Sequence, residues 1–119
     1  MRGSVVTDQR KHRRFPAQFR SSFSSVNTVE GEGVVLDLSI RGCKVSSETV
    51  VSPGTNLVLY LHASDPTPIR IAVTSVRWVR GREFGLEFVD MEDGEWKRLC
   101  QVIKDLEQSA IETDYRRKQ

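Results

Sequence analysis

A run of basic residues near the start of the chain has the chemistry of an anion-binding arm. Arg10 and Arg14 are four positions apart, with Lys11 and Arg13 between them. Arginine binds phosphate oxygens and the edge of guanine through two parallel hydrogen bonds. In an extended or turning arm, these side chains can surround one polyanion from several sides. The alternative is a solvated basic tail, which is a common fate for such a run taken alone.

A second segment places a carboxylate, a hydroxyl and a glycine at fixed offsets after an apolar, strand-like run. Asp37 and Ser39 share one face of a regular strand, because successive side chains point to opposite faces. Gly42 permits a positive φ or the close approach of a ligand. The alternative is an Asx- or Ser-type turn closed by the glycine. Together with the arginines, this segment indicates a receptor for a guanine-containing phosphate ligand.

Trp78 is a further candidate, and it lies among strand residues between Arg77 and Arg80. Its ring can serve as a stacking face for a purine or for an arginine, or it can be an ordinary core residue. Arg80 accompanies it as a candidate ligand contact. Trp96 falls on an apolar helical stripe and is therefore expected in the core.

The remaining reactive residues form no recognisable catalytic or metal-binding pattern. The two histidines and two cysteines lack the spacing of metal ligands. The sequence contains no GxxxxGKS/T loop, no GxGxxG fingerprint and no nucleophile elbow. We therefore expect no enzyme, no metal and no cofactor apart from the ligand itself. Cys43 and Cys100 are expected as reduced thiols in a cytoplasmic protein, with a disulfide between them as the alternative.

Charge is distributed unevenly along the chain, which bears on the kind of partner. The 119 residues carry a net charge of +2, yet residues 1–20 hold six basic residues against one acidic residue. A nucleic-acid-binding domain spreads its basic charge over a folded face. Concentration in one arm favours a compact anionic ligand and disfavours nucleic acid. No apolar run approaches the roughly 20 residues of a membrane helix, so membrane insertion is not expected.

The sequence predicts that short strands followed by one helix position these residues. A change of apolar parity predicts a bulge near Thr74-Ser75, and Arg80-Gly81-Arg82 predicts a hairpin turn. From Asp90 onward, apolar residues recur at steps of three and four, as on one helix face. That stripe consists of Trp96, Leu99, Ile103, Leu106 and Ala110.

About six strands and a closing helix argue for a small antiparallel β-barrel whose helix covers an opening or an edge. The predicted organisation is a flexible basic arm over residues 1–14, a barrel with its C-terminal helix over residues 15–112, and a tail over residues 113–119.

In order and spacing, these segments resemble the motifs of PilZ domains, which are bacterial receptors for the second messenger cyclic di-GMP. Arg10-x-x-x-Arg14 is similar to the family's RxxxR motif, and Asp37-x-Ser39-x-x-Gly42 is similar to its (D/N)xSxxG motif. The resemblance implies a six-stranded barrel with a helix and an arm that closes over the ligand. It implies phosphate and guanine-edge contacts for the arginines, guanine hydrogen bonds for Asp37 and Ser39, and a close turn at Gly42.

One position departs from the pattern of the family that the chain resembles. Many members that hold a stacked pair of ligand molecules carry an arginine directly before the first motif arginine, where this chain has Gln9. A single ligand or weaker stacking is therefore favoured, with Arg13 as a candidate for compensation. Trp78 stands where some members stack a guanine.

The function implied is a cyclic di-GMP receptor whose arm changes conformation on binding and which signals through a downstream protein. Two alternatives stay open at this level. One is a PilZ-like adaptor that works only through protein contacts, and the other is a small barrel that binds nucleic acid through its basic arm.

Overall fold

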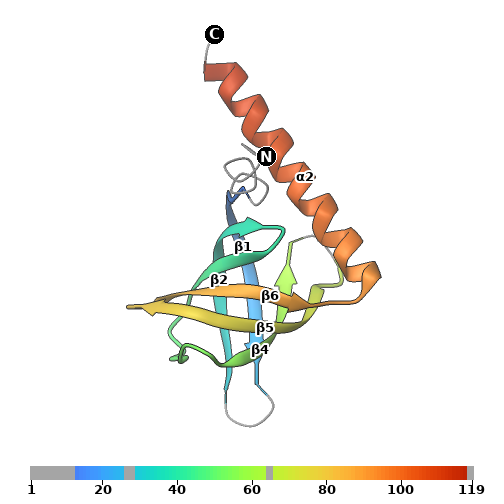
Figure 1. Ribbon diagram of the computed structural model, residues 1–119. Coiled ribbons are helices and arrows are strands. Elements are labelled where there is room, and N and C mark those ends of the chain that lie inside the picture. The colour runs from blue at the N-terminus through green and yellow to red at the C-terminus, as the bar shows by residue number, and fades with distance from the viewer. Residues whose placement is uncertain (1–12, 26–28, 64–65, 118–119) are drawn as a thin grey trace, which may run out of the picture.

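The computed structural model describes residues 13–25, 29–63 and 66–117, which form six strands and one helix (Figure 1). Side chains are described as far as Ile111. The elements are β1 (Phe15–Ser24), β2 (Glu30–Ser39), β3 (Gly42–Ser46), β4 (Asn56–His62), β5 (Ile69–Arg80), β6 (Glu83–Asp90) and α2 (Asp93–Arg117). The predicted antiparallel β-barrel with a C-terminal helix is confirmed.

The strands close into a barrel in the order β1-β2-β3-β6-β5-β4, and every pairing is antiparallel. Most pairs of neighbouring strands are consecutive in the chain and form hairpins. The exceptions are β3 with β6 and β1 with β4, which are separated by longer stretches of sequence. These two pairings close the barrel. As a result, none of the six strands is left as an unpaired edge that could template aggregation.

The barrel interior is filled by the alternating apolar residues that the sequence predicts. Leu57, Leu59 and Leu61 of β4 all point inward and are buried. Phe23 and Phe84 meet edge to face inside the barrel, with their ring centroids 5.4 Å apart. An apolar side chain of this size contributes about 1.5–3 kcal/mol when fully buried, so this interior is the main source of stability.

Irregular pairing in β5 lies where the parity change predicts a bulge. The register of β5 against β6 shifts between Val73 and Thr74, which confirms the bulge. Thr74 is buried there, and its hydroxyl donates a hydrogen bond of 2.9 Å to the carbonyl oxygen of Leu57. The predicted hairpin turn is also confirmed, since Gly81 joins β5 to β6 with a φ of 61° that residues with side chains rarely adopt.

Helix α2 attaches to the barrel through a stripe that is shifted from the one the sequence predicts, with Val102 in place of Trp96. Leu99 is completely buried and Val102 nearly so, while Ile103 packs at the margin. The expectation that Trp96 is a core residue is wrong, because its side chain is 40% exposed. Trp96 lies in line with Ile103 on the flank of the helix, so it borders a surface groove beside Phe88 instead of entering the barrel.

The start of the helix is tied to the segment before β5. Arg98 donates hydrogen bonds to the carbonyl oxygens of Thr67 and Pro68. The carboxylate of Glu95 accepts a hydrogen bond of 3.0 Å from the backbone N–H of Arg70. These contacts anchor the first turns of the helix to the barrel, and Figure 1 shows the rest of the helix extending past the strands.

The far end of the helix differs from the expected organisation. The helix continues to Arg117 and so includes most of the segment 113–119 that was expected as a tail. Residues 104–117 contain neither glycine nor proline, so no breaker ends the helix earlier. No helix within the described part of the chain is long and apolar enough to cross a bilayer.

We predict that Leu99→Ala lowers the free energy of unfolding by about 2–4 kcal/mol, because it opens a cavity between the helix and the barrel. The matched control is Ile111→Ala, since Ile111 is 57% exposed on the same helix and should change stability by less than about 0.5 kcal/mol. Urea unfolding of both variants measures the difference. Equal stabilities would contradict a helix that shares the barrel core.

Candidate ligand-binding site

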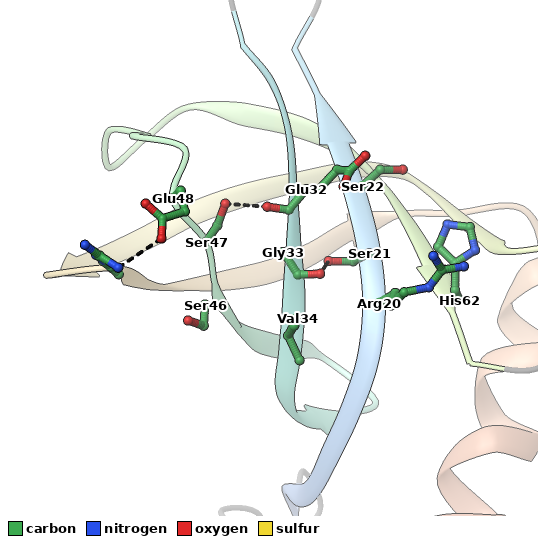
Figure 2. A pocket seen from close by; sticks show the side chains of 11 residues that line it. Arg20, Ser21, Ser22, Glu32, Gly33, Val34, Ser46, Ser47, Glu48 and His62 are labelled. Carbon is green, nitrogen blue, oxygen red and sulfur yellow. Dashed lines mark hydrogen bonds and ion pairs between the residues drawn. The ribbon is translucent and has the colours of Figure 1, made fainter.

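A wide concavity of about 620 Å³ lies on the outer face of β1, β2 and β3 (Figure 2). Arg20 and His62 form one wall, and an exposed ion pair of 2.9 Å between Arg82 and Glu48 lies at the other side. None of the motif residues that the sequence singles out lines this concavity. Within the described residues, no group of three or more histidine, cysteine or acidic side chains could hold a metal ion.

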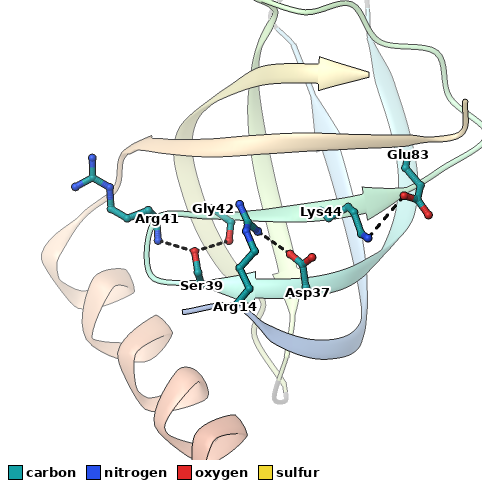
Figure 3. Close-up of polar contacts among 7 residues, drawn as sticks. All are labelled: Arg14, Asp37, Ser39, Arg41, Gly42, Lys44 and Glu83. Carbon is teal, nitrogen blue, oxygen red and sulfur yellow. Dashed lines mark hydrogen bonds and ion pairs between the residues drawn. The ribbon is translucent and has the colours of Figure 1, made fainter. Parts of the chain in front are cut away.

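The turn between β2 and β3 uses Ser39 as a structural residue. The Ser39 hydroxyl accepts a hydrogen bond from the backbone N–H of Arg41 at 3.2 Å and donates one to the carbonyl oxygen of Gly42 at 3.3 Å (Figure 3). Its side chain is only 2% exposed, so it does not share an outer face with Asp37 as a regular strand would predict. The strand ends at Ser39, and the turn captures its hydroxyl.

Gly42 is required for close packing against β6. Among the glycines that the structure describes, only Gly54 and Gly81 have a positive φ, so of the two alternatives for Gly42 the positive φ is excluded and the close approach remains. A Cβ atom at this position would overlap the carbonyl oxygen of Leu86. The close approach that the glycine permits is therefore that of a neighbouring strand of the same chain.

Asp37 and Arg14 are brought together by the pairing of β1 with β2. Pro16 pairs with Asp37, which places the preceding Arg14 beside the carboxylate. The Nη1 atom of Arg14 lies 2.6 Å from Oδ1 of Asp37, and the two side chains are 49% and 22% exposed (Figure 3). One residue from each motif thus meets across 23 positions of sequence. Of the other basic-run candidates, Arg13 packs over the ring of Phe15 at 5.0 Å, while Gln9, Arg10 and Lys11 lie outside the described residues.

Strand register aligns Asp37 with three other residues in one row across the outer surface. Asp37 pairs with Lys44, Lys44 pairs with Gly85, and Gly85 pairs with Trp78. Directly paired residues point to the same side of a sheet, so the row lies outside the barrel on β2, β3, β6 and β5. With strands about 4.8 Å apart, the row spans about 14 Å, which matches a small nucleotide.

Trp78 belongs to this outer surface, which excludes the core interpretation. Its indole lies over Gly85, where a Cβ atom would overlap the ring nitrogen. The guanidinium of Arg80 lies 5.5 Å from the ring centroid, in the range of a cation–π contact. The row therefore ends in an aromatic surface that a glycine accommodates and an arginine borders.

Two further ion pairs lie on this face, and Lys44 of the row forms one of them. Arg77 and Glu87 are 3.0 Å apart, and Lys44 and Glu83 are 3.7 Å apart. Sequence analysis missed Lys44. The alternation of Cys43, Lys44 and Val45 predicts that Lys44 points outward, but only the strand pairing shows that it is a neighbour of Asp37.

Cys43 lies directly behind the row, inside the barrel. It is fully buried, and this burial raises the pKa of its thiol far above the ordinary range. The nearby Asp37 carboxylate raises this pKa further, and Arg14 opposes the effect. Cys43 is therefore a protonated packing residue at neutral pH.

Sequence comparison assigns the chain to a family. The family model of the PilZ domain matches residues 8–105, so the chain belongs to the PilZ domain family. No curated protein matches the sequence.

Solved structures share the fold at low sequence identity. The structure of YcgR from Escherichia coli in complex with c-di-GMP has a TM-score of 0.73 and 14% identity, covering 91% of this chain and 50% of that one. The chain therefore spans half the length of that structure. The PilZ domain of the same protein with c-di-GMP has a TM-score of 0.72 and 14% identity, covering 89% and 97% of the two chains. The Bacillus subtilis inhibitor of motility, MotI/DgrA, has a TM-score of 0.64 and 19% identity, covering 81% and 50%.

We predict that Gly85→Ala displaces the indole of Trp78 and costs about 1–3 kcal/mol of stability, because the new methyl group overlaps the ring. The fluorescence of Trp78, recorded with Trp96→Phe as the background, should shift to the red. Gly94→Ala is the control, since a Cβ atom at Gly94 meets nothing within 4 Å. An unchanged spectrum in the Gly85 variant would contradict the packing of Trp78 over this strand.

A second prediction concerns the two free thiols. Cys100 is partly exposed and should react with an aromatic disulfide reagent in the native protein, whereas buried Cys43 should react only on unfolding. Cys100→Ser should remove the fast-reacting thiol. Rapid labelling in that variant would show that β3 opens readily and would contradict its central place in the barrel.

Proposed function

We propose that the protein is a cyclic di-GMP receptor and that the ligand binds along the outer row formed by Asp37, Lys44, Gly85 and Trp78. The contact between Arg14 and Asp37 at 2.6 Å carries this proposal, because it joins the two motifs at one end of the row. Membership of the PilZ family and the likeness to YcgR structures described with c-di-GMP support the choice of ligand.

The pair of Arg14 and Asp37 is suited to bind two parts of such a ligand at once. A guanidinium has five N–H donors, and only one nitrogen of Arg14 contacts the carboxylate. Its remaining donors are available to phosphate oxygens. Oδ2 of Asp37 has no partner among the described residues and can accept a hydrogen bond from the guanine edge. The ion pair therefore prepares the site instead of blocking it.

Two other motif residues, Ser39 and Gly42, are buried and support the site indirectly. Ser39 and Gly42 act by fixing the turn and the approach of β3 to β6, which hold Asp37 at its register. Trp78 provides the stacking surface for a base, and Arg80 borders it. Ser39 is in this view a positioning residue, in contrast to the direct guanine contact that the family resemblance implies.

The row is an open surface, so a tightly bound nucleotide needs a second wall. We propose that the arm with Gln9, Arg10 and Lys11 supplies it by closing over the ligand, with Arg10 binding phosphate. Ligand phosphates would neutralise the arginines and allow the arm to order on the barrel. The new arm surface would then contact a downstream protein, which gives the receptor its output within a cytoplasmic signalling pathway.

We predict that Arg14→Ala and Asp37→Ala each weaken cyclic di-GMP binding by roughly 30-fold or more, which corresponds to about 2 kcal/mol. Isothermal titration calorimetry measures the affinity and also reports whether one ligand or a stacked pair binds. Arg70→Ala is the control, because Arg70 is an exposed arginine near the other end of β5 and should bind as wild type.

Three results would separate the competing interpretations. Wild-type affinity in Arg14→Ala would contradict the assigned site. A wild-type protein that does not bind cyclic di-GMP would contradict the receptor function and favour an adaptor that works only through protein contacts. Binding of arbitrary oligonucleotides that cyclic di-GMP does not displace would favour a nucleic-acid-binding barrel.

A further inference from the structure

Lys44 lies at the centre of the outer row and points away from the core. It is paired with Asp37 on one side and with Gly85 on the other. Its sequence neighbours Cys43 and Val45 are completely buried, so alternation directs the lysine outward. Its side chain is 34% exposed, which leaves the ammonium accessible from solvent.

The ammonium of Lys44 is the least firmly held cation among the ion pairs of this face. Its Nζ atom is 3.7 Å from Oε1 of Glu83, and Figure 3 shows this pair beside that of Arg14 and Asp37. The corresponding distances are 2.6 Å for Arg14 and Asp37 and 3.0 Å for Arg77 and Glu87. A separation of 3.7 Å is too long for a hydrogen bond. Lys44 has no other polar partner among the described residues, so its three donors remain available.

The position of Lys44 matches the part of a dinucleotide that carries negative charge. Asp37 and Trp78 stand at the two ends of the row, and both suit a guanine, the first at its edge and the second at its ring face. A ligand with bases at both ends places its phosphodiester groups between them. Lys44 is the cation at that central position, between Asp37 and the indole of Trp78 that covers Gly85.

We propose that Lys44 binds a phosphate of the ligand and that Glu83 competes with that phosphate in the free protein. This inference rests on the proposed function and adds two residues to the site. Glu83 is 43% exposed and lies opposite Arg80 in the pairing of β5 with β6, so a second cation is available to it once Lys44 turns to the ligand. The competition predicts opposite effects for the two partners of one ion pair.

The experiment is calorimetric titration of the full chain with cyclic di-GMP at low and high salt. Lys44→Gln should weaken binding by about tenfold, because it removes one charged hydrogen bond to phosphate, and it should reduce the salt dependence. Glu83→Gln should tighten binding several-fold. Arg82→Gln is the control, since Arg82 pairs with exposed Glu48 away from the row and should leave affinity unchanged.

The outcomes distinguish this inference from the function on which it rests. If wild type binds and both Lys44→Gln and Glu83→Gln bind equally well, the proposal for Lys44 is overturned while the receptor function stands. If both variants weaken binding together with a loss of thermal stability, the pair has only a structural role, which also overturns the proposal. If wild type does not bind cyclic di-GMP, the proposed function fails and the inference fails with it.

Discussion

The placement of β3 between β2 and β6 is the constraint on which the candidate site depends. Its register directs Cys43 and Val45 into the core and Lys44 to the outer row. A slip by one residue would reverse all three side chains and break the row. Gly42 opposes such a slip, because only a residue without Cβ fits against the carbonyl oxygen of Leu86. Core packing and the candidate site are therefore specified by one set of strand pairings.

Asp37, Ser39 and Gly42, at the end of β2 and the start of β3, have two different roles. Ser39 is saturated by hydrogen bonds within the turn, and Gly42 is enclosed by β6. Asp37 alone presents a polar group to the outer surface, where Arg14 meets it. Two of the three motif residues therefore stabilise the backbone of the turn, and Asp37 is the one that remains available as a ligand contact.

The barrel could be predicted from sequence because its core is built from local alternation, and the β5 bulge is visible as a change of parity. Contacts between distant strands could not be predicted in the same way. Lys44 gains its importance from pairing with Asp37, and alternation alone says nothing about partners. The prediction for Trp96 was wrong because a helical stripe identifies the apolar face of the helix but does not show which edge of that face contacts the barrel. The family resemblance assigned Arg14 and Asp37 to one ligand, but their direct contact was not predicted, because it depends on the register of β1 against β2.

The mixture of opposite charges on the face around the outer row argues for a small ligand over a polymer. Carboxylates of Asp37, Glu83 and Glu87 are interspersed with the cations of this face, each paired with one of them. A nucleic-acid backbone carries phosphates at short, regular intervals, so several of them would meet a carboxylate here. A compact dinucleotide can place two phosphates between the acidic groups and still present its bases at the ends of the row. The same carboxylates that reduce the net positive charge of the face would thereby exclude the most abundant competing polyanions.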